Sequence, residues 1–155
     1  MFKLESFYEH IPSEIFLVFQ TDTMIFEENR HIVYEFLDYD YVGAPWNKSL
    51  KWAKQFNYVG NGGLSLRKKS KMLELIKNVD INIIENEDIF FSRNQKGIFV
   101  KKPEYEIAKK FSMETVFSDT TFGCHSAWKH IDRNLLYSKY PNIKQLMQLQ
   151  GVETA

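Results

Sequence analysis

The run Tyr58-Val59-Gly60-Asn61-Gly62-Gly63-Leu64-Ser65-Leu66-Arg67 is the most unusual local stretch of the chain. Its first part predicts a strand entering a glycine-dense turn, and Leu64 to Arg67 resumes the period-2 alternation of a strand. Three glycines in four residues let backbone N–H groups approach a ligand without interference from a Cβ atom. A tight hairpin with a bulge explains the run equally well. No Gly-Lys-Ser/Thr follows, so it is not a Walker phosphate loop.

Strands and helices alternate along the rest of the chain. Residues 15–19 are apolar on both faces, which is typical of a central strand buried between two layers, and residues 39–42 form a short strand that Pro45 ends. Apolar stripes of helical period predict helices over 28–37 and 68–79. A short helix after Asn86 and a helical tail over 143–149 complete the pattern. We therefore predict an α/β fold, a mixed sheet flanked by helices, in one domain covering residues 1–155.

Composition and charge limit the classes of partner. The chain has 155 residues, with 20 basic and 20 acidic side chains and a formal net charge of zero. A neutral protein offers no field for a nucleic-acid backbone or an anionic membrane surface. The longest apolar run, Ile15 to Phe19, is far shorter than the roughly 20 residues that span a bilayer. We expect no membrane span and, with no signal-peptide pattern and one cysteine, Cys124, a cytoplasmic location.

Three acidic residues stand where they could do chemistry. Asp22 directly follows an apolar strand and is surrounded by hydroxyl side chains, so its carboxylate could offer oxygen to a hard cation, although turns use the same residues. Glu87 and Asp88 lie at the start of a predicted helix, where the helix dipole favours ionised carboxylates and a base could await a hydroxyl proton. Ordinary helix-end chemistry explains this pair at least as well.

His125 and the tryptophans are further candidates. His125 follows Cys124, but neighbours in an extended chain point to opposite faces, which argues against a Cys–His nucleophilic pair. His125 could ligate a metal ion, whereas a lone histidine is more often structural. Trp46 and Trp128 lie beside polar or glycine-containing loops and could stack on a sugar, while most of the aromatic residues must form the core. Arg67 opens a basic helical segment that is mostly a solvated face, with Arg67 itself a possible phosphate contact.

Taken in order, five segments of the chain resemble the uncharacterised family of GT-A-like glycosyltransferase domains. The resemblance spans about Ile15 to Trp128, and the glycine run with the Ala-Pro-Trp before it is its most specific part. The five segments are Phe19-Gln20-Thr21-Asp22, Tyr39-Asp40-Tyr41-Val42-Gly43-Ala44-Pro45-Trp46, Val59-Gly60-Asn61-Gly62-Gly63-Leu64-Ser65-Leu66-Arg67, Asn86-Glu87-Asp88 and Gly123-Cys124-His125-Ser126-Ala127-Trp128.

The resemblance implies the C-terminal part of a GT-A fold and a metal-dependent transferase that moves a sugar from a nucleotide-sugar donor to an acceptor hydroxyl, such as that of a glycan. In this family Asp22 corresponds to the second acid of an Asp-x-Asp motif and His125 to a late histidine, so both would hold the cation. Mixed carboxylate and imidazole ligation favours Mn²⁺ over Mg²⁺. Asp88 would be the catalytic base, and Glu87 would hold a hydroxyl of the acceptor or the sugar.

The remaining implied site residues border the donor sugar and the acceptor. They are Trp46, Gly60, Asn61, Gly62, Gly63, Arg67 and Trp128.

The chain departs from the family pattern in two ways. Gln20 replaces the first acid of the motif, and only about fourteen residues precede the strand that begins at Ile15, so the nucleotide-binding part is expected to be shortened. A second chain could complete the nucleotide pocket. Because of these departures, a non-catalytic or truncated relative that binds a glycan or a partner is the alternative to an enzyme.

Overall fold

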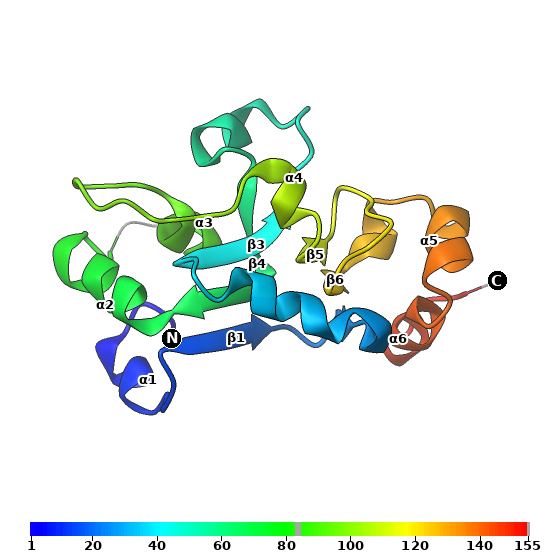
Figure 1. Ribbon diagram of the computed structural model, residues 1–155, viewed down its shortest axis with the longest axis horizontal. Coiled ribbons are helices and arrows are strands. Elements are labelled where there is room, and N and C mark those ends of the chain that lie inside the picture. Colours follow the sequence, from blue (N-terminus) through cyan, green and yellow to red (C-terminus); the bar gives the residue numbers. More distant parts are fainter. Residues whose placement is uncertain (83–84, 155) are drawn as a thin grey trace.

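In the computed structural model, which describes residues 1–82 and 85–154, strand β4 (Val59–Lys68) is the centre of the larger sheet (Figure 1). Strands β1 (Ile15–Phe19) and β3 (Tyr41–Pro45) pair with it on either side, and both pairings are antiparallel. The sequence prediction of a central strand at 15–19 is therefore wrong in position, because β1 is an edge strand. The mixed α/β class with a sheet flanked by helices is confirmed.

The predicted turn at Gly60 to Gly63 is also wrong, because β4 runs through all four residues as one strand. None of its glycines has a left-handed backbone. They are instead needed for space: a Cβ atom on Gly60 would lie 2.7 Å from the Trp46 ring, and one on Gly63 would lie 2.3 Å from the His125 ring. Glycine thus marks close packing here, not a change of chain direction.

A smaller sheet joins segments that are distant in the sequence. Its order is β2 (Thr23–Ile25), β6 (Gly123–His125) and β5 (Ser112–Met113). Strands β2 and β6 are antiparallel with Thr23 opposite His125, whereas β5 and β6 are parallel. This pairing brings the segment after β1 beside the chain around residue 125, about a hundred residues later.

Short helices surround the two sheets, with α1 and α2 at one end of the molecule and α5 and α6 at the other (Figure 1). The helices predicted over 68–79 and 143–149 are confirmed, and the segment predicted as an α-helix over 28–37 is a 3₁₀ helix. The helices are α1 (Glu5–Glu9), η1 (Glu27–Phe36), η2 (Lys51–Phe56), α2 (Lys69–Asn78), α3 (Glu87–Ser92), α4 (Tyr105–Ala108), η3 (Ala127–Lys129), α5 (Arg133–Lys139) and α6 (Ile143–Leu149).

Two of the apolar clusters of the core hold the elements that carry the site. One packs Phe90 and Phe91 of α3 against Met72 and Leu75 of α2, which fixes the acidic start of α3 beside β4. The other contains Cys124 of β6 and packs it against the C-terminal helices. Within the described ranges, no helix is both long and apolar enough to cross a membrane.

Candidate functional site

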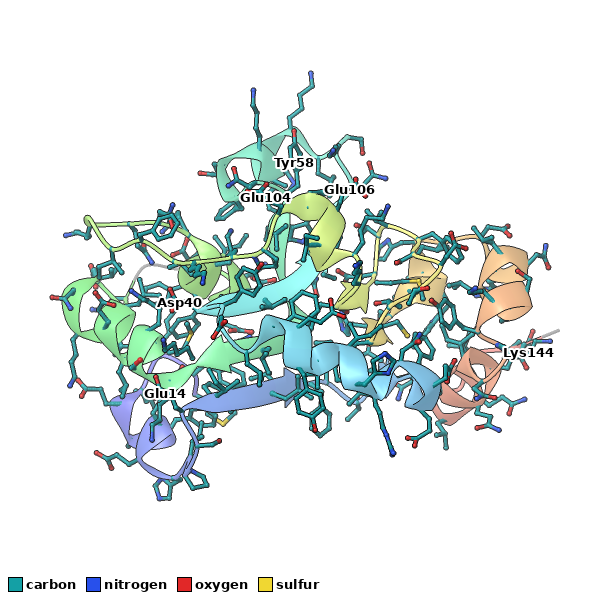
Figure 2. All side chains as sticks on the ribbon, in the orientation of Figure 1. Glu14, Asp40, Tyr58, Glu104, Glu106 and Lys144 are labelled. Carbon is teal, nitrogen blue, oxygen red and sulfur yellow. The ribbon has the colours of Figure 1, made fainter. Side chains whose placement is uncertain are left out.

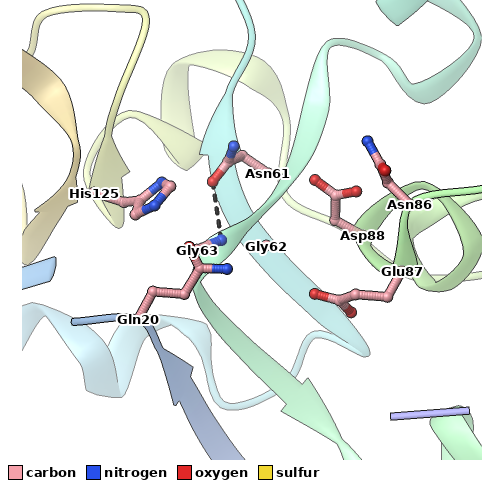
Figure 3. A pocket seen from close by; sticks show the side chains of 8 residues that line it. All are labelled: Gln20, Asn61, Gly62, Gly63, Asn86, Glu87, Asp88 and His125. Atoms are coloured by element: carbon pink, nitrogen blue, oxygen red, sulfur yellow. Dashed lines mark hydrogen bonds between the residues drawn. The ribbon is translucent and has the colours of Figure 1, made fainter. Parts of the chain in front are cut away.

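A polar pocket opens where β1 stops. The last pair between β1 and β4 is Phe19 with Leu64. From Gly63 back towards Asn61, β4 therefore has no paired strand on the edge that faces β1, although β3 stays on its other edge. A cavity of about 280 Å³ lies there (Figure 3). Its lining residues are Gln20, Asn61, Gly62, Gly63, Asn86, Glu87, Asp88 and His125.

The two sides of the pocket follow from strand geometry. Successive strand residues face opposite sides of a sheet, so Gly62 and Gly63 present their bare α-carbons in opposite directions. The start of α3 packs on Gly62, where a Cβ atom would lie 2.7 Å from the Asp88 Cβ, and the His125 ring packs on Gly63. Figure 3 shows Glu87 and Asp88 on one side of β4 and His125 on the other. The Asn61 Oδ1 atom accepts a hydrogen bond of 3.1 Å from the Gly63 N–H, which fixes the side-chain amide of Asn61 at the pocket wall between the two sides.

Glu87 is held in place by a buried arginine. The Arg67 side chain is fully buried, and its two terminal nitrogens donate to the Glu87 carboxylate at 2.6 and 3.0 Å. Arg67 Nε donates to the Ser65 hydroxyl at 2.9 Å. Such a bidentate pair restricts both the position and the orientation of the carboxylate. Glu87 therefore presents a fixed, charge-compensated carboxylate at the pocket wall.

Asp88 lies in a different electrostatic environment from Glu87. Burial raises the pKa of its carboxyl above the ordinary aspartate value and the neighbouring Glu87 charge adds to this, while hydrogen bonds from backbone groups oppose it. One of these bonds runs from the Ile89 N–H to Asp88 Oδ1 at 2.8 Å. A carboxylate whose proton affinity is raised by its surroundings is a better proton acceptor than a solvated one. Of the two neighbouring acids, Asp88 is therefore the candidate base and Glu87 the fixed anchor.

On the other side of the pocket, His125 lies between two carboxylates. Its Nε2 atom is 3.2 Å from Asp22 Oδ1, and its Nδ1 atom is 3.3 Å from Glu114 Oε1. The geometry at Nδ1 is not that of a hydrogen bond, and the second Glu114 oxygen is buried without a partner. The pairing of Thr23 with His125 explains the first contact, since Asp22 immediately precedes β2.

Asp22 is anchored by the turn that follows β6. The Ser126 hydroxyl donates to Asp22 Oδ2, the Ser126 N–H donates to the Asp22 carbonyl at 3.0 Å, and Lys129 Nζ lies 3.3 Å from Oδ2. Partial burial by itself would raise the pKa of Asp22, but the Ser126 hydrogen bond, His125 and Lys129 together hold it below the ordinary value. Asp22 thus stays ionised, with Oδ1 facing His125.

The structure brings several of the predicted site residues together. Asp88, Glu87, Asn61, Gly62, Gly63 and His125 all line the pocket, and Asp22 reaches it through His125.

Four predicted binding residues do not reach the pocket. Trp46 and Trp128 are each only 5% exposed and pack in the core, so neither offers a free ring face for a sugar. Gly60 packs against Trp46 and Ser92. Arg67 is fully buried behind Glu87 instead of lying on a solvated face, which removes it as a phosphate contact. For Trp46, Gly60 and Arg67 the reason is that β4 is buried along nearly its whole length, so its neighbourhood is core, whereas Trp128 packs in the cluster around the C-terminal helices.

Sequence reasoning missed Glu114 entirely. It follows β5 by one residue and is buried against His125, but no spacing relates it to Asp22 or His125 along the chain. Gln20 and Asn86 were predicted as a motif replacement and a helix cap, yet both line the pocket. The local sequence signal was correct in placing polar residues at strand and helix ends, but it does not say which ends meet.

The Asp22 and His125 side chains could contribute to a cation site. One carboxylate oxygen and one imidazole nitrogen in contact form an incomplete donor set, of the kind that substrate phosphate oxygens and water complete for Mg²⁺ or Mn²⁺. Across the described part of the chain, no group of three or more histidine, cysteine, aspartate or glutamate side chains is arranged to hold a metal ion. A cation here would therefore need oxygen ligands from a bound ligand.

Comparison with known proteins places the chain in a family. The family described as "Protein of unknown function (DUF5672)" matches residues 1–125. The chain belongs to this family. No curated protein and no solved structure matches it. The DUF5672 region includes every residue that lines the pocket, together with Asp22, Arg67 and Glu114.

Proposed function

We propose that this DUF5672 chain is a glycosyltransferase-like domain that transfers a sugar from a nucleotide-sugar donor to an acceptor hydroxyl in the pocket beside β4. The observation that carries the proposal is the meeting of Asp88 and His125, from segments far apart in the sequence, on one polar cavity at the bare backbone of Gly62 and Gly63. The resemblance of the ordered motifs to GT-A-like domains supports the same reaction.

The chemistry of the pocket suits a sugar. Its lining combines the side-chain amides of Gln20, Asn61 and Asn86 with the carboxylates of Glu87 and Asp88, which are donors and acceptors for hydroxyl groups. A volume of about 280 Å³ is near the lower end of the range for small-molecule sites. The glycine edge lets a ring approach the backbone without meeting a side chain.

In the proposed reaction Glu87, fixed by Arg67, holds a hydroxyl of the acceptor or the sugar, and Asp88 accepts the proton of the attacking hydroxyl. The acceptor oxygen forms a bond to the anomeric carbon as the bond from that carbon to the diphosphate oxygen breaks. A divalent cation held by Asp22 and His125 would supply neutralisation of the diphosphate charge. Gly63 keeps the His125 ring against the strand, and so keeps His125 beside Asp22.

The test is release of nucleoside diphosphate from a panel of nucleotide sugars, with and without Mn²⁺. We expect turnover that Asp88→Asn lowers by 10²-fold or more, the range for loss of a general base. Asp38→Asn, an exposed aspartate outside the pocket, is the matched control and should leave turnover unchanged. Absence of turnover with every donor, in the presence of Mn²⁺, contradicts the enzymatic proposal.

A second candidate is a glycan-binding module without catalysis, and the position of Gln20 favours it. Gln20 lines the pocket where the GT-A motif has its first acid, so the pocket offers a neutral amide in place of a charge. This candidate predicts saturable sugar binding that survives Asp88→Asn, with no turnover. Calorimetric titration of sugars into the wild-type chain and the Asp88→Asn variant, read beside the turnover assay, separates the two proposals: saturable binding without turnover supports the module, and turnover contradicts it.

A further inference from the structure

A second cavity lies away from the polar pocket, at the C-terminal end of α3. Its volume is about 100 Å³, and it shares no lining residue with the pocket beside β4. It is bounded by the end of η2, by Ser92 at the end of α3 and Asn94 just beyond it, and by the segment from Phe99 to Glu104 that leads into α4. Glu104, labelled in Figure 2, is the N-cap of α4 and lines this cavity.

The Lys102 side chain brings to this cavity an ammonium group with one N–H donor left over. Its Nζ atom donates to the carbonyl oxygens of Phe56 and Val59, both at 2.8 Å. An ammonium group has three N–H donors, so two carbonyls leave one donor over. Among the ion pairs of the described residues, none involves Lys102. The amine therefore stands partly buried at the cavity wall, with two carbonyl partners and the Phe56 ring centre 5.7 Å away, and with no carboxylate of the described residues in ion-pair contact.

Ser92 adds a second unused donor. Its side chain is fully buried, and its hydroxyl has no hydrogen-bond partner although it lines the cavity. Its oxygen lies against Gly60 of β4, where a Cβ atom would come within 2.5 Å of it. Buried polar groups are nearly always satisfied, so an unpaired hydroxyl on a residue that lines a cavity points to a molecule that completes it. Asn94 also lines the cavity, and its Oδ1 atom accepts a hydrogen bond of 2.8 Å from the Val100 N–H.

We propose that this cavity binds a small carboxylate, with the Lys102 ammonium and the Ser92 hydroxyl as its donors. Both groups donate hydrogen bonds and only one carries charge, so the complementary ligand is an acceptor with a single negative charge. The carboxylate of Glu104 lines the same cavity and disfavours a doubly charged anion such as phosphate. Because a water molecule needs roughly 10–15 Å³ by this measure of volume, a cavity of about 100 Å³ has room for at most about ten water-sized atoms, which is enough for acetate.

The site has a built-in dependence on pH. Lys102 and Glu104 are the titratable groups among its lining residues. Burial lowers the pKa of Lys102 to about 7, so the ammonium form is dominant at pH 6 and scarce at pH 8.5. A bound anion offsets the burial of the charge and raises the pKa again. Carboxylate binding should therefore weaken as the pH rises.

The experiment is a titration of the ¹⁵N-labelled full chain with sodium acetate, followed by amide shifts at constant ionic strength. We expect saturable shifts at Ser92, Val100 and Lys102 at pH 6, and an apparent affinity about thirtyfold lower at pH 8.5, from the fall in the ammonium fraction around a pKa of about 7. Lys102→Met should abolish the shifts. Lys101→Met, which removes an exposed neighbouring lysine, should leave them unchanged.

Three outcomes overturn the proposal: no saturable shift with acetate, an equal effect from chloride, or tighter binding of inorganic phosphate than of acetate. If Lys102→Met does not fold, the wild-type chain still decides the matter through ¹³Cε-labelled lysine. Acetate should raise the measured pKa of Lys102, and an unchanged pKa contradicts the site. The proposal is independent of sugar transfer, because its lining residues are separate from those of the pocket beside β4.

Discussion

The buried Arg67 side chain makes Glu87 a test of how the site is built. Glu87→Gln keeps the shape of the side chain but removes its negative charge. Arg67 is then left fully buried, with the Ser65 hydroxyl and the rings of Phe2, Tyr41 and Phe91 among its remaining neighbours. Breaking a buried ion pair by removing one partner costs about 3–5 kcal/mol, because an uncompensated charge stays in the interior.

The structure places the expected loss at the lower end of this range. The Glu87 side chain is 29% exposed, so solvent already screens part of the attraction, and glutamine can still accept one hydrogen bond. We expect the free energy of unfolding to fall by about 3 kcal/mol. For a chain of this size that corresponds to a fall in Tm of about 6–12 °C. The assay is urea unfolding at pH 7, with thermal unfolding as a second readout.

A matched control is available on the surface. Glu27 pairs with Arg30 at 2.6 Å, the same distance as the shortest Arg67–Glu87 contact, but both side chains are more than two-thirds exposed. Glu27→Gln should change the free energy of unfolding by at most about 0.5 kcal/mol. The double variant Arg67→Met with Glu87→Gln should recover part of the loss, since no buried charge remains. A loss below about 1 kcal/mol in Glu87→Gln, or a fully additive double variant, would refute the reasoning.

Three further predictions concern the pocket and the core around it. Gly63→Ala should lower the free energy of unfolding by about 1–3 kcal/mol and shift the NMR signals of the His125 ring, because the new Cβ atom would lie 2.3 Å from that ring. Unchanged ring signals contradict the packing of His125 on Gly63. Asp88→Asn should raise the free energy of unfolding at pH 7. The pKa of Asp88 is raised in the folded chain, so ionisation of this carboxyl opposes folding at pH values above its unfolded-state pKa of about 3.9, and the gain should vanish near pH 3. An equal gain at both pH values in urea unfolding contradicts this. Burial raises the pKa of the Cys124 thiol to about 12, so a disulfide reagent at pH 8 should label Cys124 only after denaturation, and rapid labelling of the native chain contradicts its burial.

Part of the fold follows from the local hydrophobic periodicity of the sequence. The apolar run from Ile15 to Phe19 is a strand, and the stripes over 68–79 and 143–149 are helices, because short-range periodicity sets which face of an element is buried. The position of β1 at the edge was beyond such reasoning. A strand that is apolar on both faces is predicted as central, whereas β1 pairs with β4 on one edge only. Its residues are mostly half-buried and Phe19 is 67% exposed, while Phe16 packs with the cluster that contains Tyr8 of α1.

The glycine run shows the same limit from another side. Gly60, Gly62 and Gly63 predict a turn when only backbone freedom is considered. In the structure each glycine is required by a specific neighbour: Ser92 and Trp46 for the first, Asp88 and Glu87 for the second, and His125 for the third. A sequence reports that a side chain is missing but does not report what occupies the space.

By itself, the sequence determined the class of the fold, the positions of several helices and of the strands of the larger sheet, and the polar residues at their ends. Only the tertiary structure decided which ends meet, that Arg67 supports Glu87 from inside the core, and that Glu114 joins Asp22 at His125. The physical reason is the range of the interactions. Secondary structure depends on neighbours a few residues away, whereas this pocket depends on contacts between strands separated by about a hundred residues, whose pairing no local spacing encodes.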